Sequence, residues 1–302
     1  MAVKESFMVF TGMDKNEYSL TPNFDEGIII KEIHIPNSVN DYLLVYIGKT
    51  LVGYYNIGKD PIGNNLFAPA ESLTEANVYN YLLARGIFRP YLVAEGETIV
   101  FKTENGTNFD LLLVYETHDA GDINPGEPGG SKSEEYDLVN YVYPATVESE
   151  SVIDTALTPT EFPAFPAAEN VPAGREIYIH GILGNPAVGV DDHTSIAHGT
   201  RTQAIKFTYN RKVLFDENKV GIPFYATDSP SANKQYGVYL SPISPCSNKD
   251  KREVFLFPEP LVFTEGEELE LKLILDQFAG STIELSSGDL VLGLIETVKI
   301  GR

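Results

Sequence analysis

The chain has 302 residues, of which 43% are apolar, enough for one large domain or two ordinary ones. Aspartate and glutamate number 43 against 22 lysines and arginines, and the formal net charge is -21. Such a surface is repelled by phosphate backbones and anionic lipid headgroups, so we expect no direct binding to nucleic acid. The single cysteine, Cys246, excludes an intrachain disulfide. We expect no secretory signal and no membrane-spanning helix, because no apolar run is long enough for either.

Short strands dominate the first part of the chain. The candidates are rich in β-branched and aromatic residues and are bounded by turn-forming residues: 27–35, 41–48, 50–58, 97–102 and 109–117. Strands at such close spacing are typical of a β-sandwich or barrel.

One segment, 72–86, predicts a helix instead. Ser72 and Glu75 have the spacing of a capping box, and Gly86 suits the end of a helix. An apolar stripe completes the pattern and consists of Val78, Tyr79, Leu82 and Leu83.

A linker rich in Gly, Pro and acidic residues begins at Asp119. It contains one strand candidate, 136–147, and continues through a proline-rich stretch, 158–174. Proline removes a backbone donor and disfavours helix, so this segment predicts an extended strap laid along a surface.

The strand pattern resumes after Gly174 and continues to the C-terminus without a convincing helix. The candidates are 175–183, 202–209, 212–217, 236–240, 252–257, 268–275 and 289–297. The predicted organisation is therefore an N-terminal arm (1–24), a first sandwich (25–120), the linker strap (121–172) and a second sandwich (173–302).

Two stretches of the chain are alike at an offset of 170 residues. Glu-Gly-Glu at 95–97 matches Glu-Gly-Glu at 265–267, and Leu-Val precedes each of them. Further matches occur in the same order in both halves: 26–37 with 174–185, Lys102 with Lys272, and 110–117 with 289–297. The glycine suits a tight turn before a strand, so the repeat predicts two sandwiches of similar topology. A pair of cation sites at the glutamates, or coincidence in a β-rich chain, are the alternatives.

Sequence motifs of catalysis are absent. There is no phosphate-binding glycine loop, no dinucleotide-binding glycine motif, no serine-nucleophile motif and no nucleophile with a nearby base, so we assign no catalytic or cofactor-binding residue and expect no enzyme. Two segments remain candidates for metal binding. One contains Asp191, Asp192, His193 and His198; the other is the acidic loop Asp119–Asp122. A solvated loop is the simpler interpretation of each.

The sequence thus predicts two tandem β-sandwiches, one short helix and a proline-rich strap, and it has no catalytic signature. In this arrangement the chain resembles the double jelly-roll major capsid proteins of tailless icosahedral viruses, including bacteriophages and the adenovirus-type lineage. The resemblance implies an all-β fold of two eight-stranded jelly rolls and a homotrimer of pseudo-hexameric outline in the virion shell. It also implies contacts with neighbouring capsomers and with penton or minor capsid proteins, and it allows an internal membrane. No functional residue can be transferred, because that family has no short diagnostic motif.

Two other functions fit the same pattern. One is a phage spike, fibre or surface adhesin built from two sandwich modules, with aromatic-rich loops that meet carbohydrate. The other is a glycan-processing enzyme on two jelly rolls, because carboxylate pairs of the glycosidase kind are not contiguous in sequence.

Overall fold

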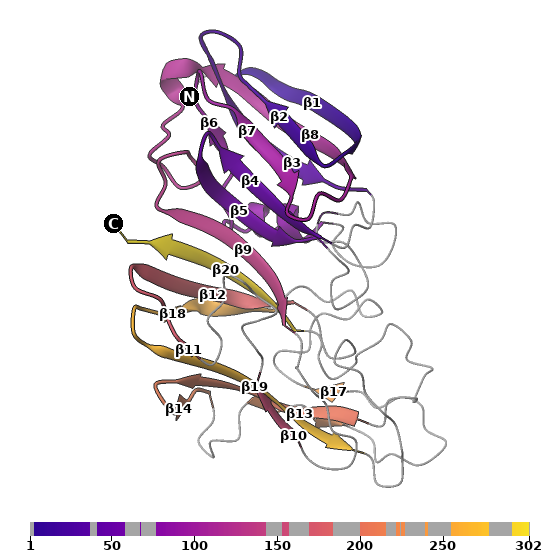
Figure 1. Cartoon of the computed structure of the whole chain (residues 1–302), viewed down its shortest axis with the longest axis vertical. Helices are drawn as coiled ribbons and strands as arrows, with labels where there is room; N and C mark the ends of the chain where they lie inside the picture. Colours follow the sequence, from indigo (N-terminus) through magenta and orange to yellow (C-terminus); the bar gives the residue numbers. More distant parts are fainter. Residues whose placement is uncertain are drawn as a thin grey trace. The chain divides into compact units, whose positions relative to one another are not determined.

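The computed structural model describes a mostly β protein (Figure 1). The described residues are 3–36, 41–57, 67, 77–142, 153–156, 169–183, 200–215, 222–223, 225–226, 239–240, 255–277 and 292–301. The chain divides into two compact units. The first unit comprises Met1–Lys59, Asn64–Val139 and Glu296–Arg302, and the second comprises Asp60–Gly63 and Asn140–Ile295. No helix among the described residues is long and apolar enough to cross a membrane.

Among the described residues, the first unit contains β1 to β8, in two sheets, and parts of β9 (Glu135–Val142) and β20 (Leu292–Ile300). One sheet has the order β1 (Val3–Lys15), β8 (Phe109–Asp119), β3 (Glu26–His34), β6 (Leu92–Val93). The other sheet contains β2 (Glu17–Leu20), β7 (Ile99–Thr103), β4 (Tyr42–Ile47) and β5 (Thr50–Asn56), in that order. The orders 1-8-3-6 and 2-7-4-5 are those of a jelly-roll sandwich: the chain passes from one sheet to the other after every strand except between β4 and β5, which pair as a hairpin.

Strand alternation explains the core of the first unit. In β7 the side chains alternate between buried and half-buried, and in β8 Phe109, Leu111 and Leu113 are buried at every second position. Successive strand residues point to opposite faces of a sheet, so these positions line one inward face. Tyr18 of β2 packs edge-on against Phe109 of β8, with ring centroids 5.0 Å apart, and joins the two sheets across the core.

The N-terminal segment corrects the predicted arm. Residues 1–24 were expected to extend away from the fold, but Val3–Lys15 and Glu17–Leu20 form β1 and β2. The prediction was wrong because the local sequence of β1 does not mark it as a strand. The thirteen-residue strand forms by pairing with β8, from Val3 opposite His118 to Lys15 opposite Phe109. Such a pairing across about a hundred residues leaves little local signal.

The predicted helix exists in a shorter form, as α1 (Val78–Ala84). Its N-cap is Asn77, whose side-chain oxygen accepts a hydrogen bond from the Asn80 amide, so the predicted capping box of Ser72 and Glu75 does not cap this helix. Ser72 and Glu75 lie outside the described residues. Gly86 has a φ of +71° just after the helix, as predicted for its C-terminal end.

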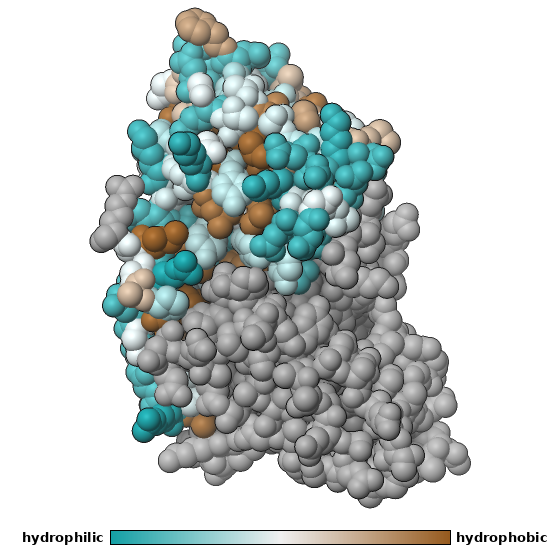
Figure 2. Space-filling model, viewed as in Figure 1, coloured by the Kyte–Doolittle hydropathy of each residue, from teal (hydrophilic) through white to brown (hydrophobic). Residues whose placement is uncertain are grey.

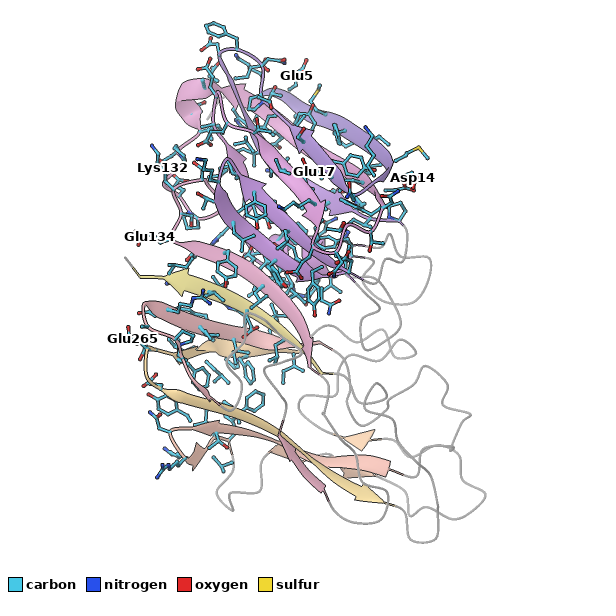
Figure 3. All side chains as sticks on the ribbon, in the orientation of Figure 1. Glu5, Asp14, Glu17, Lys132, Glu134 and Glu265 are labelled. Carbon is cyan, nitrogen blue, oxygen red and sulfur yellow. The ribbon has the colours of Figure 1, made fainter. Side chains whose placement is uncertain are left out.

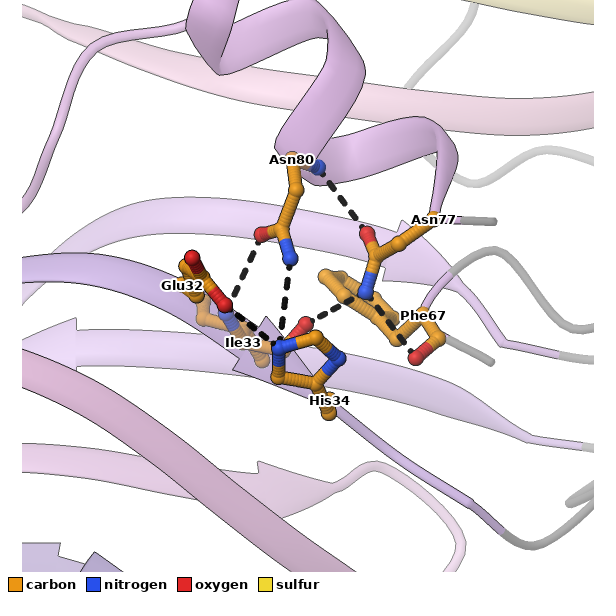
Figure 4. Close-up of polar contacts among 6 residues, drawn as sticks. All are labelled: Glu32, Ile33, His34, Phe67, Asn77 and Asn80. Carbon is orange, nitrogen blue, oxygen red and sulfur yellow. Dashed lines mark hydrogen bonds and ion pairs between the residues drawn. The ribbon is translucent and has the colours of Figure 1, made fainter. Parts of the chain in front are cut away.

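Asparagine side chains attach α1 to β3 (Figure 4). The Asn77 amide group donates to the carbonyl of Ile33 at 2.6 Å and to that of Phe67 at 3.0 Å. The Asn80 side chain accepts from the Ile33 amide at 3.2 Å. These bonds satisfy buried backbone groups where β3 ends.

The predicted linker of residues 121–172 contains strands. Within it lie β9 (Glu135–Val142), β10 (Ile153–Ala156) and β11 (Glu169–Asn170). A short 3₁₀ turn, η1 (Ala120–Asp122), overlaps the start of the linker. The strand candidate 136–147 is confirmed over its first residues by β9, whereas β10 and β11 were not predicted. The proline-rich centre of the linker, 158–168, lies outside the described residues. Strand β9 runs parallel to β5, with Asp137 opposite Gly53, and its other neighbour is β20 (Leu292–Ile300).

The second unit, together with the whole of β9 and β20, repeats the strand order of the first. Its strands include β12 (Arg175–Leu183), β13 (Thr200–Tyr209), β14 (Lys212–Val213), β15 (Ile222–Pro223), β16 (Tyr225–Ala226), β17 (Tyr239–Leu240), β18 (Phe255–Phe263) and β19 (Glu268–Gln277). The order β10-β19-β13 corresponds to β2-β7-β4 of the first unit. The order β18-β12-β20-β9 corresponds to β6-β3-β8-β1. The matched segments of the sequence repeat therefore occupy matched strands.

Candidate functional site

The repeated Glu-Gly-Glu segments form two equivalent turns. Gly96 has a φ of +78° and Gly266 a φ of +79°, a conformation that glycine adopts without steric cost. The amide of Glu97 donates to the carbonyl of Ala94 at 3.1 Å, and the amide of Glu267 donates to that of Thr264 at 3.0 Å. The first turn joins β6 to β7 and the second joins β18 to β19. The predicted equivalence of the two glycines is confirmed.

The first glutamate of each turn holds the start of another strand. Glu95 accepts a hydrogen bond from the amide of Asp25 at 2.7 Å, just before β3. Glu265, labelled in Figure 3, accepts one from the amide of Gly174 at 2.7 Å, just before β12.

The second glutamate of each turn accepts from the chain as well. Glu97 accepts from the amide of Ala94 at 3.2 Å, and Glu267 accepts from that of Thr264 at 2.7 Å. Burial by itself would raise the pKa of Glu267, but hydrogen bonds from Tyr209 and Thr264 outweigh it and lower that pKa. Because the glutamates accept hydrogen bonds from the protein's own backbone, they have a structural role. This favours the interpretation of the repeat as two structural turns over a pair of cation sites.

A cluster of tyrosines with one carboxylate lies in the core of the first unit. The buried tyrosine cluster consists of Tyr55, Tyr79 and Tyr91, and all three are fully buried. The hydroxyls of Tyr55 and Tyr91 are hydrogen-bonded to each other. Gly53 makes room for them, because a Cβ at that position would lie 2.1 Å from the Tyr91 hydroxyl.

Electrostatics in this cluster favour neutral groups. Burial, followed by the charge of Glu135, raises the pKa of Asp137 well above its usual range, against the opposing effect of Arg89 and Thr297. Burial also raises the pKa of each tyrosine, and the charge of Asp137 adds to it. A catalytic acid or base must reach a substrate, and fully buried rings do not, so the cluster serves packing and specificity of the core.

The edge of the first sheet presents apolar side chains to solvent. Four residues of β1 are exposed although apolar: Val3 (46%), Phe7 (71%), Val9 (48%) and Met13 (71%). The face drawn in Figure 2 has hydrophilic and intermediate residues with smaller apolar patches among them. In sheet order β1 is terminal, with β8 as its neighbour, so its other side carries no strand of the described chain. We define this feature, Val3–Lys15 with its exposed side chains, as the β1 edge.

The structure tests one of the two metal candidates in part. Asp119 forms an ion pair with Lys4 at 3.1 Å, and Asp122 lies in the η1 turn. Asp191, Asp192, His193 and His198 lie outside the described residues. Within the described part of the chain, no group of three or more His, Cys, Asp or Glu side chains is arranged to hold a metal ion.

No family model matches the chain, and no curated protein is similar to it. Functional inference therefore depends on the strand order, the buried clusters and the β1 edge.

Proposed function

We propose that this protein is a structural component of a virion, a capsid protein that forms homotrimers of pseudo-hexameric outline in an icosahedral shell. The observation that supports the proposal is the repeated strand order: 1-8-3-6 and 2-7-4-5 in the first unit, and corresponding orders among the later strands. A chain with two such sandwiches, repeated three times around a closed axis, supplies six similar lobes from one gene product.

Chemistry and charge are consistent with a structural role rather than an enzymatic one. The most perturbed ionisable groups of the first unit, among them Asp137 and Glu296, are buried in the core. The net charge of -21 disfavours contact with nucleic acid, so the expected partners are proteins. These are further copies of the chain, neighbouring capsomers and penton or minor capsid proteins, with an internal membrane as a further option.

The experiment is a mass measurement on the purified full-length chain. Light scattering should give a trimer of about 100 kDa from chains of 33.3 kDa, and electron microscopy should show six lobes around a threefold axis. A monodisperse monomer at high concentration would instead indicate an adhesin module or an enzyme.

Truncation of the N-terminus is not a test of assembly. Deleting residues 1–24 removes β1 and β2, one strand from each sheet of the first unit, and so unfolds the sandwich itself. Surface substitutions that leave the strands in place are required.

A further inference from the structure

The β1 edge has the features of a pairing surface. It is a strand of thirteen residues, about 43 Å long at roughly 3.3 Å per residue, and its outer side carries no described strand. Long edge strands attract other strands unless proline, charge or a covering segment protects them. No proline occurs in β1, and all eight residues from Ser6 to Met13 are uncharged.

The centre of the strand is apolar on its exposed face. Phe7, Val9 and Met13 are exposed by 71%, 48% and 71%, whereas Phe10 is half-buried and packs edge-on against Tyr18 with ring centroids 6.3 Å apart. Exposed apolar area on a strand with a free edge favours association, because pairing buries the side chains and satisfies the backbone at the same time.

Two copies of β1 placed antiparallel to each other bring compatible side chains opposite one another. Its pairing with β8 is regular from Met8 to Gly12, and irregularities flank this segment on both sides. The regular segment is centred on Phe10. In an antiparallel pair centred there, Val9 faces Thr11 of a second copy.

The same register matches the ends of the strand. It places Phe7 opposite Met13 and Glu5 opposite Lys15, so that apolar side chains meet and opposite charges meet at both ends. The four charged residues of β1 are Lys4, Glu5, Asp14 and Lys15, and they sum to zero. A neutral strip in a chain of net charge -21 is a place where two copies can meet without strong repulsion.

We infer that the β1 edge binds the β1 edge of a second copy of this chain, antiparallel and about a twofold axis at Phe10. The inference goes beyond the shell proposed above and does not need it. If the chain forms trimers, the β1 contact joins two trimers; if it does not, the contact produces a dimer. The contact is isologous, so it closes after two copies.

Site-specific disulfides test this register. Cys246→Ser provides a cysteine-free background, into which Val9→Cys, Thr11→Cys and Val3→Cys are introduced separately. Directly opposed residues have Cβ atoms about 5 Å apart, close enough for a disulfide after small adjustment. We expect the Val9→Cys and Thr11→Cys proteins, mixed under mild oxidation, to form at least tenfold more linked dimer than Val3→Cys with Thr11→Cys.

Val3 is a matched control because its exposure of 46% is close to the 48% of Val9 within the same strand. Equal linkage in the two mixtures would overturn the inference. So would predominant linkage in Val9→Cys alone, because that result places Val9 opposite itself, in a parallel pair or in another antiparallel register. With equal linkage, the irregularities of β1 would be protective features that keep the edge unpaired.

A second measurement uses charge in place of cysteine. Phe7→Lys and Met13→Lys each put a charged side chain where the proposed contact buries an apolar one, and Phe24→Lys, at a residue exposed by 92% outside the strand, is the control. Sedimentation should show at least tenfold weaker pairwise association for the first two variants and no change for the third. Unchanged association in Phe7→Lys and Met13→Lys would also overturn the inference. Absence of a trimer, by contrast, would contradict the proposed function and leave the β1 contact untouched.

Discussion

At the scale of the residue, Glu296 is the least satisfied group of the first unit. Its side chain is fully buried on β20, and neither carboxyl oxygen has a hydrogen-bond partner within the described structure. Burial raises its pKa well above the usual value of 4.5, so the folded protein holds the neutral acid. A group with a raised pKa supports folding below its unfolded-state pKa, and this contribution is lost as the pH rises toward the folded-state pKa.

Glu296→Gln should therefore be more stable than the parent chain at high pH. The gap in unfolding free energy should be small near pH 5 and should widen by about 1.4 kcal/mol per pH unit until the folded-state pKa is reached, because the amide does not ionise. Urea denaturation at a series of pH values measures this difference in unfolding free energy between Glu296→Gln and the parent. The exposed Glu259, changed to Gln, is the control, and a gap that stays constant with pH would contradict the prediction.

Asp41 shows the opposite behaviour, because its carboxylate is hydrogen-bonded. It accepts from the amide of Tyr42 at 2.7 Å, from the side chain of Asn105 at 2.9 Å and from the amide of Thr107 at 3.3 Å. Burial raises the pKa of Asp41, but these hydrogen bonds outweigh burial and lower it below the usual 3.8. A lowered pKa gives stability that is present above the unfolded-state pKa and is lost as the pH falls through the folded-state pKa.

Asp41→Ala should destabilise the first unit by about 2 kcal/mol at pH 7, because backbone donors of the 105–107 turn lose their acceptor. Asp41→Asn, which keeps one acceptor oxygen, should cost less. For both variants the loss relative to the parent should begin to shrink below about pH 4, where the Asp41 carboxyl of the unfolded parent takes up a proton. It should disappear only as the pH falls through the lowered folded-state pKa of Asp41. Equal costs at pH 7 and pH 3 would show that the charge of Asp41 contributes nothing.

At the scale of the element, the two Glu-Gly-Glu turns have the same conformation and the same structural role. Each sets a positive φ at its glycine and directs a glutamate to the start of a distant strand. A Cβ at Gly96 or Gly266 would meet no atom within 4 Å, so the cost of replacement is conformational alone.

Gly96→Ala and Gly266→Ala should each cost about 1 kcal/mol of unfolding free energy, the ordinary penalty for a left-handed alanine. Gly121→Ala is the matched control: it also has open space around it, and its φ is not positive, so its effect should stay within about 0.5 kcal/mol. Chemical denaturation measures all three. A large cost at one turn and none at the other would contradict their equivalence.

At the scale of the whole molecule, net charge opposes assembly. Copies of net charge -21 repel one another, and the two Glu5–Lys15 attractions of a β1 pair are small beside that repulsion. The screening length falls from about 10 Å at 0.1 M salt to about 3 Å at 1 M.

Self-association should therefore strengthen as sodium chloride rises from 0.05 to 0.5 M. Sedimentation equilibrium at several salt concentrations measures the change in the association constant, and the Phe24→Lys variant controls for altered surface charge. Weaker association at high salt would mean that attractive ion pairs dominate the contacts between copies.

The sequence by itself determined the features that depend on local stereochemistry. Alternating β-branched residues predicted β3, β4, β5, β7 and β8, and the glycines at 96 and 266 predicted equivalent turns, because a tight turn before a strand needs a residue that tolerates positive φ. The repeat at an offset of 170 predicted matched strands for the same reason: each half had to encode its own turns and inward faces.

Tertiary structure alone decided the features that depend on distant partners. Strand β1 looked like an arm because its pairing with β8 spans about a hundred residues. The strand β9 was predicted within the linker, but its pairing with β5 was not. The buried tyrosine cluster brings together Tyr55, Tyr79 and Tyr91 from separate parts of the chain. The spacing of these tyrosines in the sequence does not predict the cluster. Local propensity fixes where a strand can form, whereas hydrogen bonding across long sequence separations fixes which strands are neighbours and which edge stays open.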